Sequence, residues 1–164
     1  MIQVRVAGIE DVAAVNFILR ESYTALMADA YQPALLEEAL PMMVRANPRL
    51  LASGTYYLAE ADGEPAGCGG WTFDEPGTGT LEPGTAHIRH FGVRPSWIAK
   101  GIGRRLYMRC EADARAAGAR RFVCFSSLNG EPFYRALGFE RQARIEVPMG
   151  PTVRLPSILM SRPI

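Results

Sequence analysis

The sequence predicts a mixed α/β fold in which residues 1–164 form a single domain. Strand-like alternation of apolar residues recurs along the chain and is interrupted by segments with helical spacing. A strand, helix and strand follow one another between residues 86 and 125, which predicts a right-handed crossover joining parallel strands. Asp62-Gly63 stands between two strand patterns and predicts a hairpin turn. A length of 164 residues suits one domain with a real core.

The N-terminal third is expected to form one strand and two helices. Apolar residues alternate with polar ones over 2–6, which predicts the first strand. Apolar residues then recur at helical spacing over 12–27, with Asp11 expected in the first turn of this helix. Pro33 is expected to start the second helix. Pro41 is expected to kink that helix or divide it, because proline lacks the N–H of a helical bond.

The middle of the chain predicts three strands. Residues 55–60 form the first, and residues 66–73 return beside it after the hairpin turn. The glycines within 66–73 indicate a bulge or a close approach of another backbone segment. Residues 74–84 are rich in glycine, proline and threonine and predict a loop. The third strand covers 86–93.

The last of these strands carries an irregular pattern. Strict alternation places Ile88 on one face and Phe91 and Val93 on the other. If all three residues belong to one core, a β-bulge must absorb one extra residue between them. The alternative is a strand whose two faces are both buried.

The C-terminal part is expected to continue with a helix that ends at Gly118, a strand over 121–125, and a short helix between Asn129 and Gly138. Asn129 is expected to cap the short helix, and Pro132 suits its first turn. Two strand candidates follow, on either side of Pro148-Met149-Gly150-Pro151.

The most specific local motif is the segment Ile98-Ala99-Lys100-Gly101-Ile102-Gly103, which joins a strand to a helix. Unpaired N–H groups and the helix dipole make a helix N-terminus attractive to phosphate, and glycines allow close approach. Two glycines before a helix also occur by chance. A dinucleotide fingerprint would require glycine at Leu106, and a P-loop would require a Gly-Lys-Ser/Thr sequence that this chain lacks.

This segment resembles the acyl-CoA signature of the GNAT N-acetyltransferase superfamily, Arg/Gln-x-x-Gly-x-Gly/Ala. Both glycines match, whereas Ile98 departs from the leading Arg/Gln. The segment from Asn129 to Phe139 resembles a second stretch of the same family, Asn-x-x-x-Phe-Tyr-x-x-x-Gly-Phe. The resemblance implies a mostly antiparallel sheet of about seven strands with one splayed parallel pair and about four flanking helices.

The resemblance also implies acetyl-CoA as co-substrate, with no metal. By position, its binding residues fall on the central strand, the glycine loop and the later helix. They are Phe91, Gly92, Val93, Ile98, Ala99, Lys100, Gly101, Ile102, Gly103, Arg104, Asn129, Phe133 and Tyr134. In the family, a bulged strand holds the acetyl carbonyl, and the residue matching Tyr134 often acts as general acid. The alternative is a purely structural role for both residues, in which Tyr134 is a packed aromatic side chain and Asn129 only caps the helix.

The general base is left open between His87 and His90, because the position of the bulge decides which of them faces the cleft. Glu82 lies in the same region, where many relatives carry a glutamate. A histidine on a strand is also often purely structural. Catalytic candidates are therefore Tyr134, His87 and His90.

Composition and charge limit the classes of molecule that the protein is expected to bind. A net charge of +1 gives no field that favours nucleic acid or a membrane surface. Cys68, Cys110 and Cys124 lie in apolar contexts without metal-ligand spacing, so buried reduced thiols are expected, and with them a cytoplasmic location. The N-terminus reads as a strand rather than a signal peptide, and no apolar run is long enough to span a bilayer.

The function expected is acetyl transfer from acetyl-CoA to a primary amine of a small molecule or peptide, by direct attack in a ternary complex. A non-catalytic acyl-CoA-binding module and another nucleotide-phosphate-binding enzyme are the alternatives. Dimerisation is common in the family, so a homodimer is one expected state. The candidates for lining the acceptor site are Tyr23, Tyr31, Trp71, Phe73 and Glu82.

Overall fold

The computed structural model describes all 164 residues, and one seven-stranded sheet runs through it in the order β1-β2-β3-β4-β5-β7-β6. Only β4 and β5 pair in parallel, and every other neighbouring pair is antiparallel. The strands are β1 (Ile2–Val6), β2 (Tyr56–Ala61), β3 (Glu64–Thr72), β4 (Thr85–Val93), β5 (Arg121–Ser127), β6 (Glu140–Met149) and β7 (Val153–Pro163). This confirms the predicted mixed sheet with its single parallel pair.

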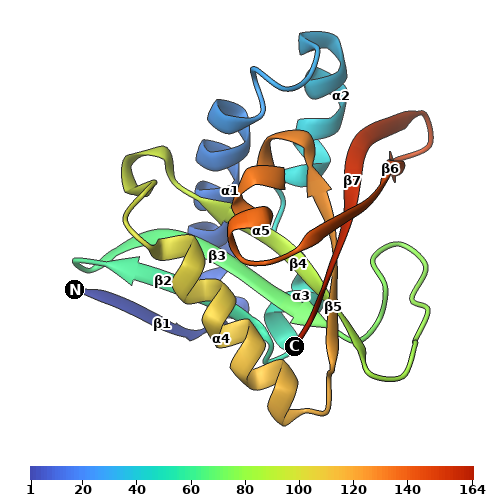
Figure 1. The fold of residues 1–164 in the computed structure, drawn as a ribbon. Coiled ribbons are helices and arrows are strands. Elements are labelled where there is room, and N and C mark those ends of the chain that lie inside the picture. The colour runs from blue at the N-terminus through green and yellow to red at the C-terminus, as the bar shows by residue number, and fades with distance from the viewer.

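Five α-helices cover the sheet. They are α1 (Val12–Leu26), α2 (Pro33–Met43), α3 (Pro48–Ala52), α4 (Ile102–Ala116) and α5 (Glu131–Ala136). Figure 1 shows α4 crossing one face of the sheet, with α1 on the opposite face and the β6–β7 hairpin reaching toward α2. None of the helices is both long enough and apolar enough to cross a lipid bilayer.

The helix ends predicted at Gly118 and Gly138 are confirmed, whereas no helix ends at Pro41. Gly118 (φ +99°) and Gly138 (φ +94°) follow the ends of α4 and α5 in the left-handed conformation that glycine tolerates. Of the two expectations for Pro41, a kink or a division of the helix, the division is wrong, because α2 continues through Pro41 to Met43. Pro41 lies in the last turn, so little helix depends on its missing N–H. The short helix α3 follows separately and was not predicted.

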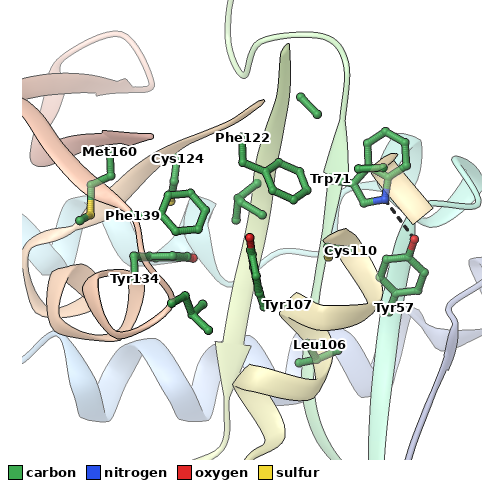
Figure 2. Packing of buried hydrophobic residues seen from close by; sticks show 14 of the residues in the cluster. Tyr57, Trp71, Leu106, Tyr107, Cys110, Phe122, Cys124, Tyr134, Phe139 and Met160 are labelled. Carbon is green, nitrogen blue, oxygen red and sulfur yellow. Dashed lines mark hydrogen bonds between the residues drawn. The ribbon is translucent and has the colours of Figure 1, made fainter. Parts of the chain in front are cut away.

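The two faces of the sheet bury separate apolar clusters, as alternation along β2 requires. Tyr57 and Ala59 pack with α4, whereas Tyr56 and Leu58 pack with α1 and α3. On the α4 side the indole of Trp71 donates a hydrogen bond to the Tyr57 hydroxyl at 3.1 Å. Figure 2 shows this pair at one end of the cluster and Tyr134 at the other. The core thus extends from the β2 side of the sheet to α5.

The predicted bulge is present in β4. Cys68 of β3 pairs with Gly92, and Gly70 pairs with Arg89, so β4 carries one residue more than β3 between these pairs. His90 lies within this interval and has a φ of +54°. A methyl group on Gly69 would lie 2.3 Å from the Phe91 ring, which explains a glycine opposite the bulge. The irregular pattern of apolar residues therefore reports a real change of register.

The parallel strands β4 and β5 pair over three positions only. Pairing starts at Thr85 with Arg121 and ends at His87 with Val123. Beyond this point the strands diverge, as Figure 1 shows. The bulge lies in the diverging part, so one edge of β4 is left open where its register changes.

Candidate functional site

A cavity of about 840 Å³ lies where β4 and β5 separate. It is lined by segments that are distant in the sequence: the bulged end of β4, the glycine loop with the first turn of α4, the end of β5, and α5. The sheet and its splayed pair thus bring both sequence motifs to one space. Nearly all the predicted binding residues line the cavity, and the exception is Lys100.

The glycine loop has the geometry expected of an anion cradle. Gly101 occupies the N-cap of α4 with a φ of +83°, and no side chain caps the helix. A methyl group on Gly101 would meet no atom within 4 Å, so the backbone there faces open space. The N–H groups of the first turn therefore remain available to an external acceptor. Gly103 serves packing instead, since a methyl group on it would lie 2.8 Å from the Phe133 ring.

Three side chains of the loop region occupy different positions. Ile98 lines the cavity and is 42 % exposed, so the residue that departs from the family motif contributes apolar surface. Lys100 lies with its ammonium 5.0 Å from the centre of the Trp97 ring, outside the cavity lining. Arg104 is exposed, lines the cavity and has neither a hydrogen bond nor an ion pair. Arg104 is thus the free cation nearest the first turn of α4.

Asn129 does not cap α5 as predicted. The N-cap is Gly130, and Asn129 lies one residue earlier, in the 3₁₀ turn Leu128–Gly130. Its side-chain oxygen is buried and has no hydrogen-bond partner, although Asn129 lines the cavity. Burying an amide oxygen without a donor is unfavourable by roughly 1–3 kcal/mol. The structure therefore holds a polar group that a bound molecule could satisfy.

Tyr134 extends from α5 toward β4 and is 7 % exposed (Figure 2). Its ring packs edge-on against Phe139 and Phe133, with ring centres 5.4 and 5.0 Å apart. Burial, together with the nearby Cys124 thiol, raises the pKa of Tyr134 well above its ordinary value. The phenol therefore keeps its proton at neutral pH, as a proton donor must.

The two histidines are placed differently. His87 stands at the last paired position of β4, is buried against Phe125, and does not line the cavity. His90 stands in the bulge and lines the cavity. Its Nε2 lies 2.7 Å from the Met43 carbonyl oxygen, so Nε2 carries a proton and Nδ1 has no protein partner. Burial lowers the pKa of His90, which keeps the imidazole neutral.

Side chains that the sequence did not single out hold the bulge in place. The Tyr56 hydroxyl donates to the His90 carbonyl at 2.7 Å, and the Tyr23 hydroxyl donates to the Phe91 carbonyl at 2.6 Å. Ser22 accepts a hydrogen bond from the Val93 N–H at 3.2 Å. No local pattern announces these contacts, because they join β2 and α1 to β4 across long sequence separations.

The expected acceptor-lining residues are only partly brought together. Tyr23 lines the cavity, whereas Tyr31, Trp71, Phe73 and Glu82 do not. Tyr31 instead donates to the Pro156 carbonyl at 2.6 Å, and Trp71 belongs to the core. Methionines and arginines near the end of α2 and on β4 line this part of the cavity in their place.

The three cysteines are free and buried, as expected. Cys124 lines the cavity, but burial raises the pKa of its thiol to about 12, so it is a poor nucleophile at neutral pH. No group of three His, Cys, Asp or Glu side chains is placed to hold a metal ion.

Comparison with known proteins agrees with this geometry. The family model described as the acetyltransferase (GNAT) family matches residues 17–139. A GCN5-related N-acetyltransferase from Rhodopseudomonas palustris superposes with a TM-score of 0.81 at 23 % identity, covering 99 % of this chain and 95 % of that one. The PaiA N-acetyltransferase from Thermoplasma acidophilum, solved with coenzyme A, gives 0.76 at 18 % identity, covering 100 % and 99 %. An acetyltransferase structure from Salmonella typhimurium with acetyl-CoA gives 0.66 at 21 % identity, covering 99 % and 94 %.

Proposed function

The chain belongs to the acetyltransferase (GNAT) family, and from that premise we propose that it moves the acetyl group of acetyl-CoA to a primary amine of a small molecule or peptide. The transfer proceeds by direct attack of the amine within a ternary complex. The observation that carries this proposal is the meeting of the glycine loop, the unpaired Asn129 amide and Tyr134 in one cavity.

The residues present suit acetyl-CoA. The first turn of α4 and Arg104 would hold its phosphates, and the Asn129 oxygen would accept a hydrogen bond from an amide N–H of its pantetheine arm. The edge of β4 beyond the bulge, from Phe91 to Val93, has no strand partner on the side of β5. Apart from the Phe91 carbonyl and the Val93 N–H, which Tyr23 and Ser22 already occupy, the backbone groups on this side can pair with such an arm as a strand does. When bound, acetyl-CoA supplies an activated acyl carbon on a thioester.

In this proposal His90 is the general base of the reaction and Tyr134 is the general acid. A neutral amine must form the new C–N bond, so His90 Nδ1 accepts the proton that the ammonium or the attacking amine gives up. Tyr134 gives its proton to the sulfur as the C–S bond breaks. Of the two histidines we assign this role to His90, since His87 does not line the cavity.

The test follows thiol release from acetyl-CoA with a panel of primary amines. We expect amine-dependent release by the wild type and a fall in kcat of about 10²-fold in Tyr134→Phe, because a positioned acid contributes about that much. Tyr107→Phe is the matched control, since Tyr107 is a buried tyrosine outside the cavity lining.

Two other outcomes would contradict the proposal. Tight binding of acetyl-CoA without turnover on any amine would indicate a non-catalytic acyl-CoA-binding module. Displacement of acetyl-CoA by ATP or NAD at similar concentration would indicate a different nucleotide-phosphate-binding enzyme.

A further inference from the structure

The charge of the cavity is one-sided. Three arginines line it, Arg45, Arg89 and Arg104, and no aspartate or glutamate does. Arg104 lies beside the glycine loop, at the end of the cavity assigned to phosphates. Arg89 precedes the bulge on β4, and Arg45 follows α2, whose Met43 carbonyl contacts His90. The two remaining arginines therefore lie in the part of the cavity near His90, away from the glycine loop. We call this part the acceptor side, because the proposed acceptor amine must reach His90 there.

Arg89 is a partly satisfied cation inside the protein. Its side chain is 15 % exposed, and its only hydrogen bond goes from Nη1 to the Thr72 hydroxyl at 2.8 Å. The Asp74 carboxylate lies 3.6 Å from the same nitrogen and is itself 39 % exposed. Burial lowers the pKa of Arg89, Asp74 offsets part of this effect, and Arg49 lowers the pKa slightly further, so the carboxylate compensates the buried guanidinium only in part. A second anion would complete its hydrogen bonding.

A small polar space adjoins the main cavity at Arg89. Its volume is about 170 Å³, and it shares Asn47, Leu50 and Arg89 with the main cavity. Arg49 lines the small space, and Arg45, two residues before Asn47 in the chain, lines the main cavity without a hydrogen bond or ion pair. Two arginines thus line the small space, and Asp74 is the one carboxylate in its lining. A carboxylate fits this junction in both size and charge.

The rest of the acceptor side is apolar. Met27, Met42, Met43 and Met149 line the main cavity together with Phe125 and Leu155. Methionine side chains adapt to the shape of an apolar ligand and contact aliphatic or aromatic groups favourably. This wall offers no carboxylate to an extended cation.

Resting on the proposed function, we propose that the acceptor is an amino acid with an apolar side chain. Its carboxylate binds Arg89 at the junction of the two cavities, its side chain packs on the methionines, and its amine faces His90. The surrounding arginines also disfavour the ammonium form of the acceptor, which helps to supply the neutral amine. Polyamines and other extended cations are excluded by the same charges.

The experiment compares an amino acid with the amine that lacks only its carboxylate. The acceptors are L-leucine, 3-methylbutylamine and spermidine, each assayed by thiol release from acetyl-CoA, with acetyl-CoA affinity measured on the same samples. We expect the wild type to favour L-leucine over 3-methylbutylamine by about tenfold or more in kcat/KM, because a charged hydrogen-bonded pair contributes at least that much. L-Phenylalanine and phenethylamine form a second pair.

Variants assign the preference to Arg89. We expect Arg89→Met to lower the ratio of kcat/KM for L-leucine over 3-methylbutylamine about tenfold, mainly through KM, and Arg89→Lys to restore part of it. Arg20→Met is the matched control, since Arg20 is an exposed arginine on α1 without an ion pair. An unchanged ratio in Arg89→Met would overturn the assignment.

The outcomes separate this inference from the proposed function. Turnover of 3-methylbutylamine or spermidine in preference to L-leucine would overturn the inference and leave amine acetylation intact. Failure to turn over any of the amines would overturn both, and the affinity measurement would show whether acetyl-CoA binding survives.

Discussion

Single residues at the bulge link backbone geometry to the proposed proton transfer. His90 is held from both sides, by the Tyr56 hydroxyl on its carbonyl and by the Met43 carbonyl on its Nε2. The contact at Nε2 fixes which ring nitrogen carries the proton and leaves Nδ1 without a protein partner. The sequence could not decide whether His87 or His90 faces the cavity. The point where β4 and β5 separate decides it in favour of His90. That point depends on strand pairing between residues more than thirty positions apart.

His90 also gives a prediction for pH dependence. Burial lowers the pKa of His90 below its ordinary 6.5, the bond to the Met43 carbonyl offsets part of this effect, and Arg89 adds a smaller lowering. If His90 is the base, its own protonation lowers kcat/KM only below pH 6.5, whereas protonation of the acceptor amine acts at higher pH. We expect His90→Gln to lose the limb below pH 6.5 and about 10²-fold in rate. A limb below pH 6.5 that persists unchanged in the variant would contradict the assignment.

The same shift has a consequence for folding. The unfolded chain binds a proton at His90 more readily than the folded chain does. Stability that is present above pH 6.5 is therefore lost as the pH falls through this value. His90→Gln removes this contribution, so the two proteins should differ in the pH profile of their unfolding free energy.

At the scale of elements, β3 and β4 show how glycine makes the bulge possible. The glycines of β3 were predicted to mark a close approach, and the Phe91 ring occupies the space that a side chain on Gly69 would need. The irregular period of β4 was also readable from the sequence. In contrast, the Tyr23 and Ser22 contacts from α1 and the short helix α3 follow from tertiary packing and leave no local signal.

This packing predicts the effect of one methyl group. Gly69→Ala should destabilise the protein by about 1–3 kcal/mol, because Phe91 must move out of its rotamer or the bulge must shift. It should also weaken acetyl-CoA binding, since Phe91 lines the cavity. Urea unfolding monitored by circular dichroism gives the free energy.

Gly8→Ala is the control for that variant. A methyl group on Gly8 meets only the end of the flexible Glu10 side chain, and its φ of −125° suits alanine. Equal losses of stability in the two variants would mean that the Phe91 contact is not what requires glycine at position 69.

At the scale of the whole molecule, the sheet brings the segments of the candidate site together. The mixed sheet and its parallel pair could be predicted, because the crossover and the strand patterns are local and strong. The start of α4 directly after the glycine loop could be predicted for the same reason. The expected N-cap of α5 at Asn129 was wrong, because the sequence rule for capping is local, whereas the burial of the Asn129 side-chain oxygen depends on tertiary packing. The arginines on the acceptor side were not predicted either, because tertiary packing, and not a local sequence pattern, brings them to the cavity.

The central claim is that the cavity between β4 and β5 binds acetyl-CoA, and the most direct measurement is calorimetric titration of acetyl-CoA into four proteins. The wild type should bind, Arg104→Glu should bind about tenfold more weakly, and Asn129→Ala about fivefold more weakly without loss of stability. Arg20→Glu, with the same charge change on α1, should match the wild type. Absence of binding by the wild type, or equal affinity in all four proteins, would contradict the account.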